Sequence, residues 1–210
     1  DLTSVAALGT TIVGTNGQDT TANAGTGNVT INAGAGADTI TTAGGADNIT
    51  AGEGADVITA GDGNDTIDLT ETTSAIDTVH FSATAANGAD TITGFVKAKD
   101  VLNVELLAGG NVAAEAAVAA NAAKADIASA TVIVFADGAD GTGTEAIADY
   151  TDLTDVAAFI DAGITAAASE TFAIVINDVA GGKAYVYNVT DAGDGGVENN
   201  EVTLHATISV

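Results

Sequence analysis

The stretch AGEGADVITAGDGNDTID, from Ala51 to Asp68, contains one pattern twice: Gly-x-Gly-x-Asp-x-Ile begins at Gly52 and returns nine residues later at Gly61. A period of nine fits neither a helix nor the plain alternation of a strand. It suits a short strand followed by a glycine-rich turn, because glycine adopts positive φ at little cost. Short internal periods of this kind are typical of solenoids.

Further copies precede this stretch. GAGADTI begins at Gly34, and AGGADNI begins at Ala43, which stands where the first glycine is expected. One unit earlier, GTGNVTI keeps both glycines but has Val29 in the aspartate position. Earlier still, GTNGQD ends at Asp19 and is displaced by one residue. Four consecutive copies therefore carry the aspartate, and the first coil departs from the pattern.

Two units make one coil of 18 residues, with a strand on each side. This predicts that Ile31, Ile49 and Ile67 stack in one parallel sheet, while Ile40 and Ile58 stack in the sheet that faces it. A strand starting at each aspartate points one isoleucine inward, so the core between the two sheets is thin.

The same geometry stacks the aspartates. Asp38 falls below Asp56, and Asp47 falls below Asp65, on rungs ~4.8 Å apart. Two carboxylates at that distance repel by roughly 3.5 kcal/mol at an effective dielectric constant of about 20. A hard cation with oxygen ligands relieves this repulsion, and Ca²⁺ accepts about six to eight oxygens in a flexible geometry that Mg²⁺ does not tolerate. A metal-free solenoid, in which glycine and aspartate only form turns, is the alternative.

The units resemble the RTX (repeats-in-toxin) nonapeptide over about residues 14–68. The resemblance implies a parallel β-roll that holds Ca²⁺ between turns one coil apart. The implied ligands of one site are Asp38 and Asp56 with the carbonyls of Ala33, Ala35, Gly52 and Gly54. The implied ligands of a second site are Asp47 and Asp65 with Thr42, Gly44, Gly61 and Gly63. Asp19 and Asp90 are further candidate ligands, and Val29 predicts an N-terminal coil that is poor in metal.

Residues 76–104 contain three less regular copies of the repeat. This succession resembles the capping end of an RTX roll. Asp77, Asp90 and Asp100 each precede an aliphatic residue by two positions, and they either bind metal or form turns. His80 alternates with Val79 and is expected on the surface. We therefore expect residues 1–104 to form the β-roll with its capping rungs.

Residues 105–210 are expected to form a β-rich domain with one or two short helices. An alanine-rich helix is predicted within residues 109–128, since alanine is the best helix former, and a buried strand over 130–137. A second helix is predicted over 154–168: Thr154 is its expected cap, and Val156, Phe159, Ile160 and Ile164 share its apolar face.

The end of the chain predicts three strands. Residues 170–178 and 183–191 flank a turn at 179–182 and read as a hairpin, and residues 201–210 form a last strand with His205 on its solvated face. The acidic loop 191–201 is either a solvated loop or a calcium site, although it lacks the spacing of an EF-hand.

Composition limits the function. With 29 acidic and 4 basic residues, and a formal charge of −25, the chain is a poor partner for nucleic acid and for anionic membranes. Cysteine is absent, no apolar run approaches a membrane helix, and no signal peptide opens the chain. Asp1 suggests a processed or trimmed fragment. No nucleophile, metalloprotease or phosphate-loop motif occurs, so an enzyme is not expected.

We therefore expect a secreted, extracellular, calcium-binding structural protein whose roll folds on binding Ca²⁺ and which self-assembles at the cell surface as a layer or filament. The resemblance to RTX proteins implies type I secretion, and the alanine- and threonine-rich composition resembles bacterial surface-layer proteins with RTX segments. A cell-surface polysaccharide, bound through a segment outside this sequence, is a further expected partner. The alternatives are a monomeric calcium-folding and export module of a larger secreted enzyme or adhesin, and a roll that binds ice or glycans through outward threonines.

Overall fold

The computed structural model describes residues 2–3, 10–22, 25–81, 88–96, 99–103, 115–118, 125–127, 132–136, 151–166, 171–178, 182–190, 197–198 and 200–209. The chain divides into two compact units. Unit 1 comprises Asp1–Val104 together with Ala206–Val210, and unit 2 comprises Glu105–His205. The division falls inside the last strand, β18 (Val202–Ser209).

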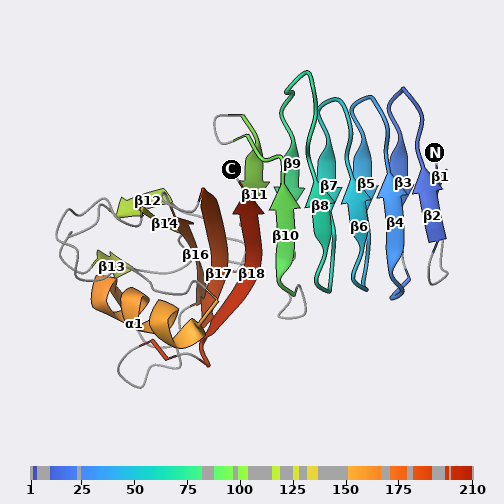
Figure 1. Ribbon diagram of the computed structural model, residues 1–210. Coiled ribbons are helices and arrows are strands. Elements are labelled where there is room, and N and C mark those ends of the chain that lie inside the picture. Colours follow the sequence, from blue (N-terminus) through green and yellow to red (C-terminus); the bar gives the residue numbers. More distant parts are fainter. Residues whose placement is uncertain are drawn as a thin grey trace. The chain divides into compact units, whose positions relative to one another are not determined.

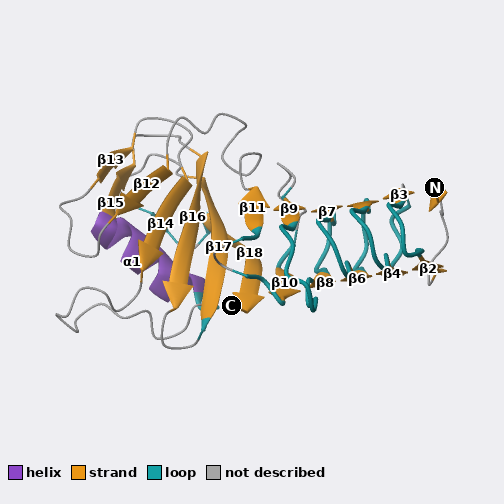
Figure 2. Ribbon diagram, turned by 90° about the horizontal axis from the view of Figure 1, so that it is seen from above, coloured by secondary structure: helices purple, strands orange, loops and turns teal. Residues whose placement is uncertain are grey.

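Unit 1 is a parallel solenoid of two facing sheets joined by short turns (Figure 1, Figure 2). The first sheet contains, in order, β1 (Leu2–Thr3), β3 (Thr20–Ala22), β5 (Thr39–Thr41), β7 (Val57–Thr59), β9 (Thr78–His80) and β11 (Val101–Asn103). The second contains β2 (Thr10–Val13), β4 (Val29–Asn32), β6 (Asn48–Thr50), β8 (Thr66–Asp68), β10 (Asp90–Thr93) and the end of β18. The predicted parallel β-roll is confirmed.

The isoleucine columns lie where the nine-residue period places them. Ile31 pairs with Ile49, and Ile49 with Ile67, in the second sheet, while Ile40 pairs with Ile58 in the first. All five are at most 1% exposed. Beyond the repeat, the columns continue through Val79 in the first sheet and through Ile92 and Ile208 in the second.

The glycines of the turns are required by close approach between coils. Gly54 has a φ of 122°, and a Cβ there would lie 1.9 Å from the carbonyl oxygen of Gly36 in the preceding coil. Gly52 has a φ of 103° and would place a Cβ 1.9 Å from the oxygen of Gly34. A side chain at either position is excluded by both the backbone conformation and the neighbouring turn.

Unit 2 contains a sheet and one described helix (Figure 1). The sheet runs β12 (Glu115–Val118), β14 (Val132–Ala136), β16 (Thr171–Asp178), β17 (Lys183–Thr190) and the start of β18, and a separate pair joins β13 (Ala125–Ile127) to β15 (Ile164–Ala166). The antiparallel pairing of β16 with β17 confirms the predicted hairpin.

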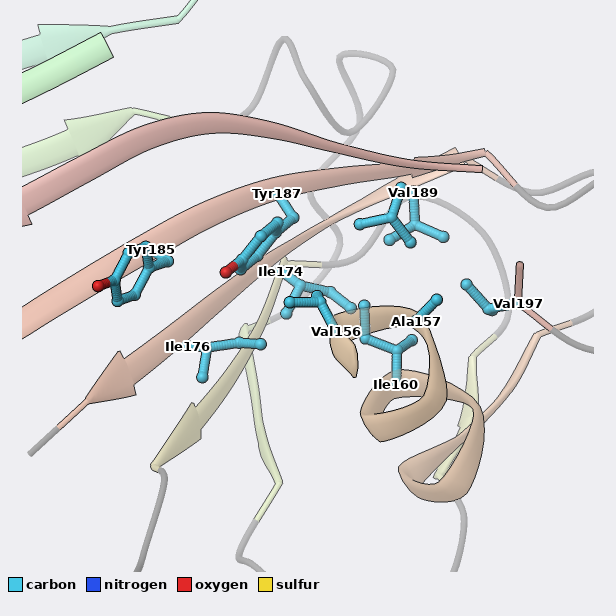
Figure 3. Close-up of a cluster of buried hydrophobic side chains, with 10 residues drawn as sticks. Val156, Ala157, Ile160, Ile174, Ile176, Tyr185, Tyr187, Val189 and Val197 are labelled. Atoms are coloured by element: carbon cyan, nitrogen blue, oxygen red, sulfur yellow. The ribbon is translucent and has the colours of Figure 1, made fainter. Parts of the chain in front are cut away.

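The helix α1 (Leu153–Gly163) buries one face against this sheet. Val156 and Ile160, both 0% exposed, face Ile174 and Tyr187 (Figure 3). Full burial of such aliphatic side chains contributes about 1.5–3 kcal/mol each. Unit 2 therefore has a hydrophobic core of its own.

Several expectations for the second half of the chain were wrong in detail. Within 109–128, the described residues form β12 and β13 rather than a helix, because pairing with β14 and β15 overrides alanine's local preference. Asp152, not Thr154, caps α1: its Oδ1 accepts a hydrogen bond of 2.9 Å from the Thr154 N–H. The helix ends at Gly163, so Ile164 belongs to β15.

The histidine expectations also differ from the structure. His205 is 2% exposed, because β18 departs from simple alternation and buries His205 and Ala206 in succession. His80 is half-buried rather than fully on the surface. Most of the acidic loop 191–201, and the side chain of Phe159, lie outside the described residues. No described helix has the length and apolarity needed to cross a membrane.

Candidate metal centre

The turn aspartates of unit 1 form two continuous columns, each built by one repeated hydrogen bond. In the first column, the N–H of each aspartate donates to Oδ1 of the aspartate one coil further on. The donor-to-acceptor distances are 2.7 Å for Asp19 to Asp38, 2.8 Å for Asp38 to Asp56, 2.9 Å for Asp56 to Asp77 and 3.1 Å for Asp77 to Asp100.

The second column follows the same rule on the other side of the roll. The N–H groups of Val29 and Asp47 donate to Oδ1 of Asp47 and Asp65, both at 2.8 Å. The Asp65 N–H donates to Oδ1 of Asp90 at 2.9 Å. Val29 starts this column without a carboxylate of its own, as the sequence pattern indicated.

The second carboxylate oxygen of most of these residues has no partner. In the described part of the chain, five aspartate Oδ2 atoms are buried and accept no hydrogen bond: those of Asp38, Asp47, Asp56, Asp65 and Asp77. The residues are at most 2% exposed. A buried carboxylate oxygen without a donor or a cation is strongly unfavourable. These oxygens are therefore suited to bind a cation, because no donor group in the described part of the protein satisfies them.

The turn carbonyls divide into two sets. The central carbonyl of each turn, those of Gly34, Ala43, Glu53 and Asp62, accepts a hydrogen bond of 2.7–3.0 Å from an N–H group of a neighbouring coil. The carbonyls that flank them in the turns accept no backbone hydrogen bond within the described residues. They include every main-chain oxygen named as a ligand from the sequence: those of Ala33, Ala35, Thr42, Gly44, Gly52, Gly54, Gly61 and Gly63.

Burial changes the acidity of the columns. Desolvation is the largest cause, and it raises the pKa of Asp56 to about 6, of Asp65 and Asp77 to about 7 and of Asp90 to about 8. The pKa of Asp38 is raised for the same reason. The hydrogen bond from the adjacent coil lowers each pKa, and the neighbouring carboxylates raise it again. Without metal, the carboxyl groups of Asp56, Asp65, Asp77 and Asp90 therefore resist ionisation near neutral pH.

The two ends of the first column differ from its middle. Oδ2 of Asp19 accepts hydrogen bonds from the N–H and the hydroxyl of Thr15, at 2.6 and 2.9 Å. Oδ2 of Asp100 accepts one from the Val96 N–H at 2.7 Å. Asp19, a candidate ligand from the sequence, and Asp100 therefore use this oxygen to hold a turn.

The structure brings together Asp38 with Asp56 and Asp47 with Asp65, the two pairs named as calcium ligands, and places Asp90 at the end of the second column. Among the described residues, three or more acidic or histidine side chains nowhere gather in a metal-binding cluster. A cation in these turns would take its ligands from two carboxylates and from main-chain carbonyls, which are the oxygen donors Ca²⁺ prefers.

Sequence reasoning left the role of Asp77 open and gave no role to Glu53 or Glu71. Both oxygens of Glu53 are occupied: Oε1 accepts from the N–H and hydroxyl of Thr72, and Oε2 from those of Thr73, at 2.6–3.1 Å. These bonds lower the Glu53 pKa to about 2. Glu71 accepts from the N–H groups of Gly54 and Ala75. No sequence motif predicts these contacts, because they involve residues 71–75, which do not follow the nine-residue period.

Comparison with known proteins agrees with this geometry. Residues 13–49 and 41–71 match the family model of the RTX calcium-binding nonapeptide repeat, which spans four copies. No curated protein and no solved structure matches the chain.

The fold and the turn aspartates define a calcium-binding parallel β-roll. Residues 13–71 are RTX nonapeptide repeats by this match, and repeats of this kind bind Ca²⁺. The repeat is a structural calcium-binding motif rather than a catalytic one, and the match ends at residue 71.

Proposed function

We propose that this chain is a secreted structural protein whose β-roll folds on binding Ca²⁺ and which then self-assembles at the cell surface. The observation that carries calcium-dependent folding is the set of five buried Oδ2 atoms without partners. We assign the two sequence-derived ligand sets, around Asp38 with Asp56 and around Asp47 with Asp65, as the sites. Each pair of stacked carboxylates is compensated when a divalent cation lies between them.

Binding to the folded state alone stabilises that state by mass action. At a formal charge of −25, the metal-free chain also repels itself, which opposes compaction. The protein would stay unfolded where free calcium is scarce and fold outside the cell, where calcium suffices for modules of moderate affinity. Type I secretion, which RTX proteins typically use, fits this order of events.

Apolar side chains on the outer faces of the roll support association between copies. Val57 and Val101 lie in the same outward row of the first sheet and are 38% and 45% exposed. Val13, on the outer face of β2, is 65% exposed. Burying such groups between protomers is favourable, while the acidic surface requires calcium to offset repulsion between copies. A cell-surface polysaccharide, held by a segment outside this sequence, would attach the layer.

The alternative is a monomeric calcium-folding and export module of a larger secreted enzyme or adhesin. It is favoured by β18, whose Ala206, Thr207 and Ile208 pair with β10 and complete the second sheet of the roll. In either case we propose that residues 1–104 form the calcium-folding domain and residues 105–210 a separate β-rich domain without catalytic activity.

Calcium titration of chelator-stripped protein tests the proposal, with circular dichroism and light scattering recorded on the same sample. If β-structure and particle size rise together, calcium drives both folding and assembly. If β-structure rises while the particle stays monomeric, the export-module alternative holds and self-assembly is wrong. A protein that is already folded without calcium, and does not change on its addition, would contradict calcium-dependent folding itself.

A further inference from the structure

Asp77 lies beyond the glycine repeat and beyond the residues that match the RTX family model. It follows Asp56 by 21 residues instead of 18, and the segment LTETTSAI that precedes it, residues 69–76, has no glycine. By the sequence pattern alone, the repeat ends before this residue.

The structure nevertheless gives Asp77 the burial and the hydrogen bonds of an aspartate inside the repeat. It is 1% exposed, its Oδ1 accepts the Asp56 N–H at 2.9 Å, and its own N–H donates to Asp100. Its Oδ2 is buried and accepts no hydrogen bond. The residues at the two ends of the same column, Asp19 and Asp100, both have Oδ2 hydrogen-bonded. Asp77 therefore belongs with Asp38 and Asp56, not with the column ends.

Two glutamates replace the missing glycine turn. In the repeats, successive turns are joined by main-chain bonds, such as that from the Gly36 N–H to the Glu53 carbonyl at 2.7 Å. In the turn that precedes Asp77, the Glu53 carboxylate instead accepts hydrogen bonds from Thr72 and Thr73. Oε2 of Glu71 accepts the Gly54 N–H at 3.2 Å, and Oε1 accepts the Ala75 N–H.

These contacts place the longer segment over the turn below it. Gly54 and Ala75, the two residues that Glu71 joins, stand two positions before Asp56 and Asp77 respectively. The three additional residues are thus absorbed in the turn, and the two carboxylates return to the spacing of a repeat. Asp100, the next member of the column, then ends it with a fully hydrogen-bonded carboxylate.

We propose that Asp56 and Asp77 hold a further Ca²⁺ ion, at a rung of the roll that carries no nonapeptide. The inference rests on the proposed calcium-binding function and extends it by one rung. Asp56 is shared with the repeat-encoded rung below, so the new site lengthens a continuous row of cations. Glu53 and Glu71 hold the turn that brings Asp77 into place.

The test compares calcium stoichiometry in Asp77→Asn, Asp38→Asn and Asp155→Asn, measured by elemental analysis after equilibrium dialysis against a calcium buffer. Asparagine keeps one acceptor oxygen for the hydrogen-bond column but removes the charge and the second oxygen ligand. Asp155, on the exposed face of α1, controls for loss of one negative charge. We expect Asp77→Asn and Asp38→Asn to bind less calcium per folded chain than the wild type, and Asp155→Asn to bind the same amount.

The possible outcomes distinguish failure of the proposed calcium-binding function from failure of the further site alone. A wild type that binds no calcium contradicts the proposed function. A wild-type stoichiometry in Asp77→Asn, alongside a loss in Asp38→Asn, contradicts only the further site.

Should Asp77→Asn not fold at saturating calcium, anomalous diffraction from calcium-grown crystals of the wild type decides. A peak between the carboxylates of Asp56 and Asp77 supports the site. Peaks between Asp38 and Asp56 without one there overturn it.

Discussion

Each turn aspartate in the middle of a column uses its two carboxylate oxygens differently. Oδ1 accepts the N–H of the adjacent coil and so fixes the spacing of the turns, as between Asp38 and Asp56 at 2.8 Å. Oδ2 is left buried without a donor. One side chain thereby aligns the coils through a hydrogen bond and creates the need for a cation in the same place.

The raised pKa values predict how the calcium-free protein responds to pH. A buried aspartate whose folded pKa exceeds its unfolded value of 3.8 stabilises the fold below that value, and this contribution is lost as pH rises through the folded pKa. For Asp56, Asp65, Asp77 and Asp90, the loss therefore begins near pH 4 and is complete by about pH 6 to 8, depending on the residue.

In chelator, we therefore expect more β-structure at about pH 5 than at about pH 8, and this difference should diminish when calcium is present. Circular dichroism at the two pH values, with and without calcium, measures it. Proton release on adding calcium near neutral pH, followed in a weakly buffered solution, is the matching readout. Greater stability in chelator at the higher pH would show that the aspartates are not protonated in the folded roll.

Gly54 and Gly44 form a matched pair for testing the turn geometry. Gly54→Ala places a Cβ against the Gly36 oxygen at a φ of 122°, and positive φ alone costs a non-glycine residue about 1–3 kcal/mol. Gly44 does not have a positive φ, and a Cβ there would meet nothing closer than 3.7 Å. We expect Gly54→Ala to raise the calcium concentration needed for folding at least several-fold, and Gly44→Ala to leave it nearly unchanged. Equal effects would mean that contact between the turns does not limit folding.

The repeat strands β5 to β8 are only three residues long, so each contributes one inward isoleucine to the core. Ile58 lies between Ile40 and Val79 in the first sheet and is 0% exposed. A core this narrow has little capacity to close over a deletion, because neighbouring coils are held apart by the hydrogen-bond ladder.

We expect Ile58→Ala to destabilise the calcium-loaded roll by about 2–5 kcal/mol. The adjacent Val57 points outward and is 38% exposed, so Val57→Thr should change stability by less than about 1 kcal/mol. Thermal denaturation in saturating calcium measures both. If the two substitutions were equally costly, the assignment of inward and outward positions would be wrong.

At the scale of the whole molecule, the two units draw their stability from different sources. The roll combines an aliphatic column with buried carboxylates, whereas unit 2 packs α1 against β16 and β17 around Ile160, Ile174 and Tyr187. Calcium is therefore expected to stabilise the roll, while the described core of unit 2 is held by apolar packing.

We therefore expect Ile160→Ala to destabilise unit 2 by about 2–5 kcal/mol without changing the stoichiometry of calcium bound by the roll. Ala158→Ser, on the exposed face of the same helix, serves as the control. Near-ultraviolet circular dichroism follows the tyrosines of β17, and calcium binding by equilibrium dialysis follows the roll. Loss of bound calcium in Ile160→Ala would show that the roll does not hold its metal independently of unit 2.

The amino-acid sequence by itself determined the solenoid, its coil of 18 residues, the stacking of Ile31 with Ile49 and Ile67, and the pairing of Asp38 with Asp56. These follow from a strict period, since identical units that cannot bury their apolar face alone must stack in register. The nine-residue period cannot predict the structure of segments in which the spacing between aspartates changes.

Only the tertiary structure decided that Asp77 joins the first column after 21 residues and Asp90 the second after 25. It also decided that His205 is buried and that the segments around Ala116 and Asp126 form strands. The physical reason is common to all of these. Loop length costs little free energy, and alternation and helix propensity are weak local preferences. Contacts with residues distant in the sequence, such as that of the Glu53 carboxylate with Thr72 and that of Glu71 with Gly54, therefore determine the outcome.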